Sequence, residues 1–242
     1  MPRLDLLDRS KAALAGASDV PPLENGDFLT GAEFERRYDA MPEGVRAELI
    51  DGIVYMASPA RPEHGHPHLI LATWLGTYEA ATPGTDAEAA ITLRLGPKDL
   101  PEPDVLLRID PEAGGISRTE RGLVTGPVEL AAEVAYSSAS RDLNQKRARY
   151  WKQGILEYLV LVVRAGELRW FVRRRDDYVA MRPDRRGVLH SRVFPGLWLD
   201  APALVAGDTK RVLATLAKGL RSREHGAFVT KLRRRRLSQD RP

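Results

Sequence analysis

Two charged residues, Glu133 and Lys146, stand where the sequence pattern predicts apolar side chains. Glu133 lies inside a run that is apolar on nearly both faces, and Lys146 lies on the stripe of a helical pattern that should face a sheet. Burying a charge costs free energy unless the charge is paired or bound to a metal ion. Two interpretations follow: a buried Glu133–Lys146 ion pair that serves only the fold, or an active site at the end of a strand.

Two further carboxylates extend this set. Glu48 lies in the first arm of an expected hairpin, and Asp104 follows Pro103 directly ahead of an apolar run. Each has an ordinary explanation, because a solvated hairpin often carries a Glu and an Asp often begins a strand after a turn. Together, however, carboxylates with few softer ligands suit Mg²⁺ or Mn²⁺, which prefer oxygen. A lysine beside such an ion can orient and polarise an attacking water.

Glu133 and Lys146 belong to a strand–helix–strand unit at residues 128–163. The sequence VELAAEVAYSS predicts a central strand, and ILEYLVLVV predicts a second buried strand. The residues between them have helical spacing, with Leu143 and Tyr150 on one face, and Gly154 is expected to end the helix. A unit of this length predicts an α/β core with a sheet.

Other patterns predict the elements around this unit. They comprise a short helix GAEFERRYDAM, a hairpin of residues 47–50 and 53–57 around Asp51-Gly52, an amphipathic helix from about Pro67, strands at 86–96 and 105–109, a loop at 111–126, two antiparallel strands within 167–181, a segment 188–200 that closes the sheet, and one or two helices within 201–223.

Three alternating histidines, His64, His66 and His68, precede the amphipathic helix and suggest a metal site. Gly65 and Pro67 make their backbone irregular, and no fourth ligand follows nearby. We therefore prefer the explanation that these histidines are polar residues of a loop that precedes the helix.

Composition bounds the class of protein. The chain has 242 residues and no cysteine, which excludes disulfides, thiolate zinc sites and cysteine nucleophiles. No apolar stretch is long enough to span a bilayer, so a cytoplasmic protein without membrane contact is expected. Phosphate loops of the GxxxxGK type, GxGxxG turns and GxSxG elbows are absent.

Charge is concentrated at the C-terminus. From Lys231 to Pro242 there are six Lys or Arg and one Asp, a net charge of +5, so that the remaining chain carries −1 of the total of +4. We expect a loosely ordered extension at residues 1–27, a single domain at 28–225 and a basic, disordered tail at 226–242.

Four stretches together resemble a known family: AELIDGIVYMASP with a histidine soon after it, PEPDVLL, ELAAEVAYSSASRDLNQKRARYWKQGILEYLVL, and SRVFPGLWLD. In order and content they resemble the PD-(D/E)XK nuclease superfamily, and more closely the bacterial Uma-type family of restriction endonucleases. The resemblance covers Ala47 to Asp200. It implies a restriction-endonuclease-like α/β (α+β) fold, with a mixed sheet of about four or five strands flanked by helices and the site at one sheet edge.

The resemblance also implies roles for the residues. Asp104 and Glu133 would hold Mg²⁺ or Mn²⁺, with Glu48 as an additional acidic ligand. Ala135 stands two residues after Glu133, where many members carry the catalytic lysine, and Lys146 on the following helix would take that place. Glu48, Asp104, Glu133 and Lys146 are thus the expected catalytic residues.

Two functions remain open at this point. The first is a Mg²⁺-dependent endonuclease that hydrolyses phosphodiester bonds in DNA or another nucleic acid, with a homodimer expected by analogy with two-strand cleavage. The second is a nuclease-fold module that binds nucleic acid or regulates without useful turnover, which the near-neutral body favours because strong DNA binders usually present a basic face.

Overall fold

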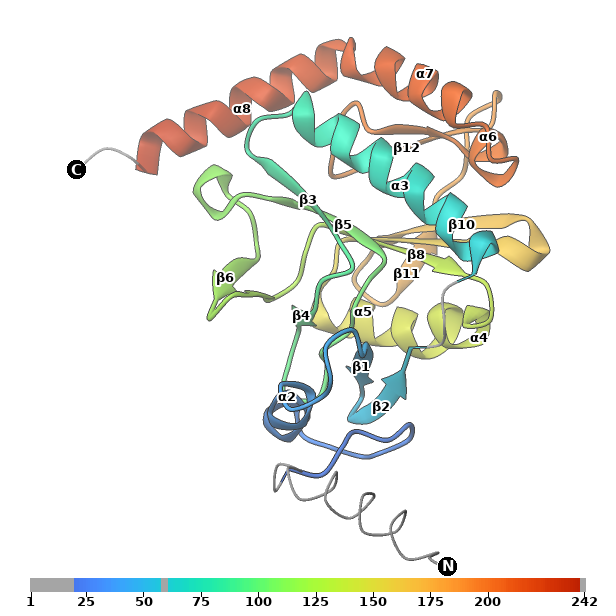
Figure 1. Ribbon diagram of the computed structural model, residues 1–242. Coiled ribbons are helices and arrows are strands. Elements are labelled where there is room, and N and C mark those ends of the chain that lie inside the picture. The colour runs from blue at the N-terminus through green and yellow to red at the C-terminus, as the bar shows by residue number, and fades with distance from the viewer. Residues whose placement is uncertain (1–19, 58–60, 240–242) are drawn as a thin grey trace, which may run out of the picture.

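A six-stranded mixed sheet forms the centre of the fold, in the computed structural model that describes residues 20–57 and 61–239 (Figure 1). Its strands, in spatial order, are β11 (Tyr178–Ala180), β10 (Glu167–Arg173), β9 (Glu157–Val162), β8 (Leu130–Ala135), β5 (Val105–Ile109) and β3 (Thr85–Ala89). Strands β8 and β9 pair in parallel, as the strand–helix–strand pattern predicts, and the other neighbours are antiparallel. The predicted α/β fold class is confirmed, with more strands than the resemblance implied.

Alternation along β8 separates two hydrophobic cores. Leu130, Ala132 and Val134 face one core, and Ala131 and Ala135 face the other. Helices α3 (Pro62–Ala80), α7 (Thr209–Leu220) and α8 (Arg223–Gln239) cover the first face, and the helix that joins β8 to β9 covers the second (Figure 1). Successive strand side chains point to opposite faces, so Glu133 points toward the connecting helix.

The connecting helix has three parts: α4 (Ala139–Arg141), a π-helical turn (Asp142–Lys146) and α5 (Arg147–Gln153). It ends at Gly154, whose φ of 97° is the left-handed conformation that glycine adopts without steric cost. This end of the helix was predicted, whereas the π-helical turn was not.

Smaller elements flank the main sheet. They are α2 (Gly31–Tyr38), the hairpin β1 (Ala47–Ile50) and β2 (Ile53–Met56), the hairpin β12 (Val188–His190) and β13 (Trp198–Asp200), the sheet of β4 (Leu93–Arg94), β7 (Leu123–Thr125) and β6 (Arg118–Glu120), and α6 (Ala201–Val205). The β1–β2 turn has positive φ at Asp51 (54°) and Gly52 (83°), which confirms the hairpin predicted from this dipeptide.

Three local predictions need correction. The strand expected at 86–96 breaks at Ala90, whose φ is 53°, so that β3 and β4 belong to different sheets. The loop expected at 111–126 contains the β6–β7 hairpin, turned by Arg121 and Gly122 with positive φ. Helix α3 begins at Pro62 rather than near Pro67, and proline is well tolerated at this first helical position. Pro67 lies inside the helix.

The prediction of a disordered C-terminal tail also needs correction. Helix α8 continues through Lys231 to Gln239, and it buries Phe228 and Leu232 in the core. Apolar side chains one turn apart anchor the basic segment, which its charge pattern alone did not reveal. The expected boundaries at residues 27 and 225 stay predictions.

Most of the predicted N-terminal extension, residues 1–19, lies outside the described residues. Within the remainder, Leu23 is buried against β1 and β2. Within residues 20–57 and 61–239, no helix combines the length and apolar character needed to span a bilayer. The cytoplasmic location stays a prediction.

Candidate active site

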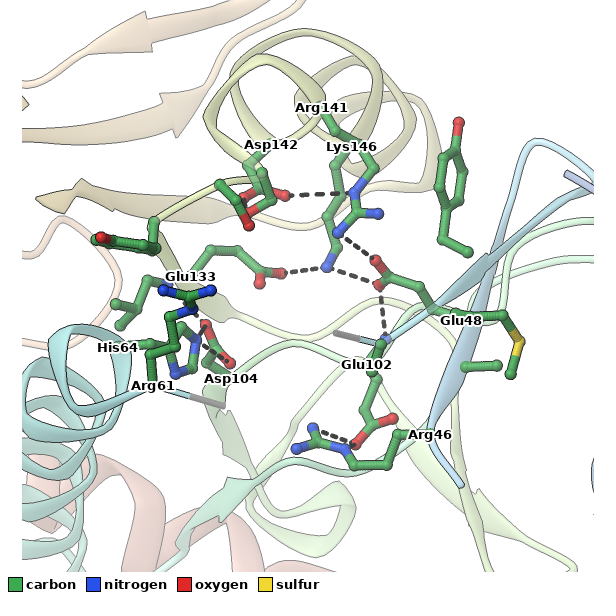
Figure 2. Close-up of a pocket in the computed structure, with 18 of the residues that line it drawn as sticks. Arg46, Glu48, Arg61, His64, Glu102, Asp104, Glu133, Arg141, Asp142 and Lys146 are labelled. Carbon is green, nitrogen blue, oxygen red and sulfur yellow. Dashed lines mark hydrogen bonds and ion pairs between the residues drawn. The ribbon is translucent and has the colours of Figure 1, made fainter. Parts of the chain in front are cut away.

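Lys146 lies at the centre of a buried group of charges. Its Nζ is 2.8 Å from Glu133 Oε1 and 2.8 Å from Glu48 Oε2, so the lysine lies between two carboxylates (Figure 2). The side chains of Lys146 and Glu133 are only 2% and 6% exposed. The ion pair that the sequence suggests is therefore present, and it is extended by a second carboxylate from a distant hairpin.

The π-helical turn helps to direct Lys146 inward. Asp142 and Lys146, at its two ends, are both buried. Tyr158 Oη of β9 donates a hydrogen bond to the backbone oxygen of Asp142 at 3.1 Å, and Tyr55 Oη of β2 donates one to Gln145 Oε1 at 2.7 Å. The turn is thus held from both the sheet and the hairpin. Such turns occur frequently at functional sites.

Glu133 reaches this network from the C-terminal half of β8. Tyr150 Oη of α5 donates a hydrogen bond to Glu133 Oε1 at 3.1 Å, the oxygen that also contacts Lys146. Burial raises the pKa of Glu133 well above its usual value, although Lys146 acts in the opposite direction. Repulsion from Asp104 and Asp142 adds to this rise in pKa.

Lys146 keeps its proton. Burial on its own would lower the pKa of Lys146, but the facing carboxylates of Glu133 and Glu48 outweigh burial and raise this pKa well above its usual value. A permanently charged ammonium group can orient a water or hold a phosphate oxygen, but it cannot accept a proton. The lysine is therefore suited to an electrostatic role.

Asp104 stands immediately before β5 and is oriented by the neighbouring strand. The backbone N–H of Val134 in β8 donates to Asp104 Oδ2 at 2.7 Å. His64 Nε2 of α3 lies 3.2 Å from Asp104 Oδ1. Burial works to raise the pKa of Asp104, but the hydrogen bond and charge of His64 hold that pKa below its usual value. The same contact with Asp104 raises the pKa of His64.

The histidine motif contributes more than the sequence led us to expect. His64 and His68 share one face of α3, and His68 Nε2 lies 2.9 Å from the backbone oxygen of Asp104. His66 points elsewhere and lies beside Gly207. The prediction of a histidine-containing loop is wrong because α3 already includes all three residues, and the i, i+4 spacing of His64 and His68 was the signal that could have indicated a shared face.

Glu48 is placed by tertiary contacts of the β1–β2 hairpin. Its carboxylate contacts Arg141 Nη2 at 3.2 Å as well as Lys146. At the tip of the hairpin, Asp99 accepts hydrogen bonds from the backbone N–H of Asp51 at 3.0 Å and from Arg149 Nε of α5 at 3.0 Å. These contacts tie the hairpin to the helix that carries Lys146.

A cavity of about 640 Å³ contains all four residues predicted from the sequence. Arginines from four segments also line it: Arg46, Arg61, Arg141 and Arg164. Arg141 lies over the ring of Tyr55 at 4.7 Å, and Arg164 lies over the ring of Tyr136 at 4.5 Å. Acidic side chains at the centre of a cavity with arginines in its walls suit a cation together with an anionic substrate such as a phosphodiester.

The residues present fit a divalent cation, by the chemistry of their donor atoms. Glu48, Asp104 and Glu133 bring carboxylates to one cavity, and Lys146 is the buried cation between two of them. In the described part of the chain, the one group of three His, Cys, Asp or Glu with possible ligand atoms all within 4.8 Å of one another is His64, His68 and Asp104. The three predicted carboxylates therefore share a cavity without forming such a group by themselves.

In this architecture, a mixed sheet gathers acidic residues and a lysine where β8 ends and β5 begins. Residues 32–202 match the model of the Uma2 family, described as "Putative restriction endonuclease". The match spans most of the chain, and the chain belongs to the Uma2 family.

A solved structure shares the fold. The fold is similar to the crystal structure of "a putative nuclease belonging to DUF820" from Anabaena variabilis ATCC 29413, with a TM-score of 0.52 and 12% sequence identity. The similarity covers 75% of this chain and 97% of that chain. No curated protein matches the chain.

Proposed function

We propose that this protein is a metal-dependent endonuclease that hydrolyses phosphodiester bonds in DNA. The observation that carries the proposal is the buried ammonium of Lys146, 2.8 Å from both Glu133 and Glu48, in a cavity that also contains Asp104. Family membership and the similar nuclease fold support the same class of reaction.

Asp104 and Glu133 would hold Mg²⁺ or Mn²⁺, with Glu48 as a further acidic ligand. A divalent ion at such a site supplies charge stabilisation for the scissile phosphate and a more acidic bound water. The buried carboxylates favour its binding, because repulsion among them contributes to the raised pKa of Glu133. A dication would relieve that repulsion.

The side chains around the carboxylates would bind and orient the substrate. Lys146 would position the attacking water through its permanently charged ammonium group. Arg61 and Arg164 line the cavity and would contact phosphates of the substrate. A displaced lysine on the helix after β8 thus takes the role that many superfamily members give to a lysine on the strand.

A cleavage assay over several nucleic-acid forms tests this proposal. We expect supercoiled plasmid and linear duplex DNA to be cut with Mg²⁺ or Mn²⁺, and to remain intact with EDTA or when Asp104→Asn replaces the wild type. RNA and single-stranded DNA in parallel reactions identify the preferred nucleic acid. If none of these nucleic acids is cleaved in a metal-dependent way, the proposed endonuclease function is excluded.

A second candidate function is a nuclease-fold module that binds nucleic acid without cutting it. The near-neutral charge of the chain before Lys231 favours it, and so does the ability of Lys146 to satisfy two carboxylates without any metal ion. Calorimetric titration with Mg²⁺ and Mn²⁺ separates the two functions, because the module needs neither ion. The predicted homodimer would present two sites to a duplex, and sedimentation velocity measures it.

A further inference from the structure

His64 lies at the distance from Asp104 that two ligands of one cation would have. Its Nε2 is 3.2 Å from Asp104 Oδ1 and 3.3 Å from Oδ2. Two adjacent ligand atoms in an octahedral shell, each about 2.1 Å from the ion, lie about 3.0 Å apart. A shared cation would therefore need only small movements of these side chains.

His64 and His68 both belong to the group of possible ligands around Asp104, but of the three histidines His64 alone lines the cavity. His64 lines the cavity with a side chain that is 28% exposed, whereas His66 and His68 are not among the residues that line it. Figure 2 shows His64 beside Asp104 in the cavity, on the side of Arg61. The imidazole thus lies where an ion held by Asp104 can reach it.

The surroundings of Asp104 hold this pair in place. The backbone N–H of Val134 fixes Asp104 Oδ2, and His68 Nε2 is engaged with the Asp104 backbone oxygen at 2.9 Å. The rings of His64 and His68 contact edge to face, with centroids 5.7 Å apart. Outer contacts of this kind orient metal ligands before the ion arrives, and here they leave His64 as the nitrogen that faces the cavity.

We propose that His64 is a nitrogen ligand of the divalent cation, so that the site has a mixed nitrogen–oxygen donor set and selects Mn²⁺ over Mg²⁺. This inference deepens the metal-dependent function proposed above and rests on it. Imidazole favours transition-metal ions, whereas a shell of oxygen atoms alone suits Mg²⁺. The competing explanation is a hydrogen bond in which His64 only orients Asp104.

Pulsed EPR of bound Mn²⁺ separates ligation from orientation, because a coordinated imidazole nitrogen modulates the electron spin echo. The critical variant is His64→Gln, whose amide can still donate a hydrogen bond to Asp104. His66→Gln is the matched control, since it makes the same change two residues away on the same helix, where the side chain lies beside Gly207. Circular dichroism checks that both variants are folded.

We expect nitrogen modulation in the wild type and in His66→Gln, and none in His64→Gln. Calorimetry should show Mn²⁺ affinity reduced by about tenfold or more in His64→Gln, with a smaller change in Mg²⁺ affinity. The ratio of Mn²⁺ to Mg²⁺ affinity should therefore fall toward one in this variant alone.

Two results overturn the inference while the proposed function stands: Mn²⁺ that binds to the wild type without nitrogen modulation, or modulation that persists in His64→Gln. A wild-type protein that binds neither Mn²⁺ nor Mg²⁺ overturns both the inference and the metal-dependent nuclease.

Discussion

Replacing Lys146 by Met tests the centre of the site. The change removes the ammonium group and keeps an unbranched stem of similar length, so packing near Tyr150 is largely preserved. It leaves Glu133 and Glu48 without the cation that lies 2.8 Å from each. Removing one partner of a buried ion pair costs about 3–5 kcal/mol, and we expect a loss of stability in this range without divalent ions.

The size of this effect depends on metal and on pH. For a chain of this length, about 2–4 °C of melting temperature corresponds to each kcal/mol, so we expect a fall of roughly 6–20 °C in EDTA. Burial already raises the pKa of Glu133, and loss of Lys146 raises it further. A carboxyl group whose pKa is higher in the folded state than in the unfolded state destabilises the protein as pH rises from the unfolded-state pKa through the folded-state pKa. The loss of stability in Lys146→Met should therefore be smaller at pH 5 than at pH 8.

Divalent ions should restore much of the stability that Lys146→Met loses if the carboxylates hold a metal. We expect Mn²⁺ to raise the melting temperature of Lys146→Met by more than it raises that of the wild type, because the ion replaces the missing positive charge. Cleavage should nevertheless fall by about 100-fold or more, since water and phosphate no longer meet the ammonium group.

The measurements are thermal denaturation with and without Mn²⁺, and plasmid cleavage at a fixed Mn²⁺ concentration. Lys152→Met is the matched control, because it makes the same change on the exposed face of α5. Wild-type cleavage rates in Lys146→Met would refute the catalytic role of Lys146. A large loss of stability that Mn²⁺ does not relieve would show that the pair serves only the fold.

Two further predictions concern regions outside the site. Arg233→Gln with Arg234→Gln, on exposed positions of α8, should weaken binding to all DNA sequences alike and lower the slope of the salt dependence by about 0.9 for each phosphate that the variant no longer neutralises. The double variant keeps the buried Leu232, which a truncation of α8 would remove. An unchanged salt slope in a filter-binding assay would exclude this segment from DNA binding. Burial raises the pKa of Glu157 from 4.5 to about 7, so its contribution to stability falls as pH rises from about 4.5 to 7, by about 3 kcal/mol. Urea denaturation at pH 5 and pH 8 should show a smaller fall for Glu157→Gln than for the wild type, and equal falls would contradict the assignment.

Local sequence patterns determined the main elements and part of the site. The run that is apolar on nearly both faces placed β8 with Glu133 inside it, and the helical spacing placed Lys146 on the stripe that faces the sheet. Asp51-Gly52 and Gly154 ended their elements as predicted. These inferences succeed because periodicity and turn conformation depend on residues within a few positions of one another.

Long-range packing decided the remainder. Glu48 meets Lys146 because Asp99 and Arg149 tie a distant hairpin to α5, and His64 meets Asp104 because α3 starts earlier than its proline suggested and packs across β5. The basic C-terminal segment is helical because Phe228 and Leu232 pack in the core. Each outcome depends on burial of apolar surface and pairing of charges between segments far apart in the chain, and local patterns carry no record of those partners.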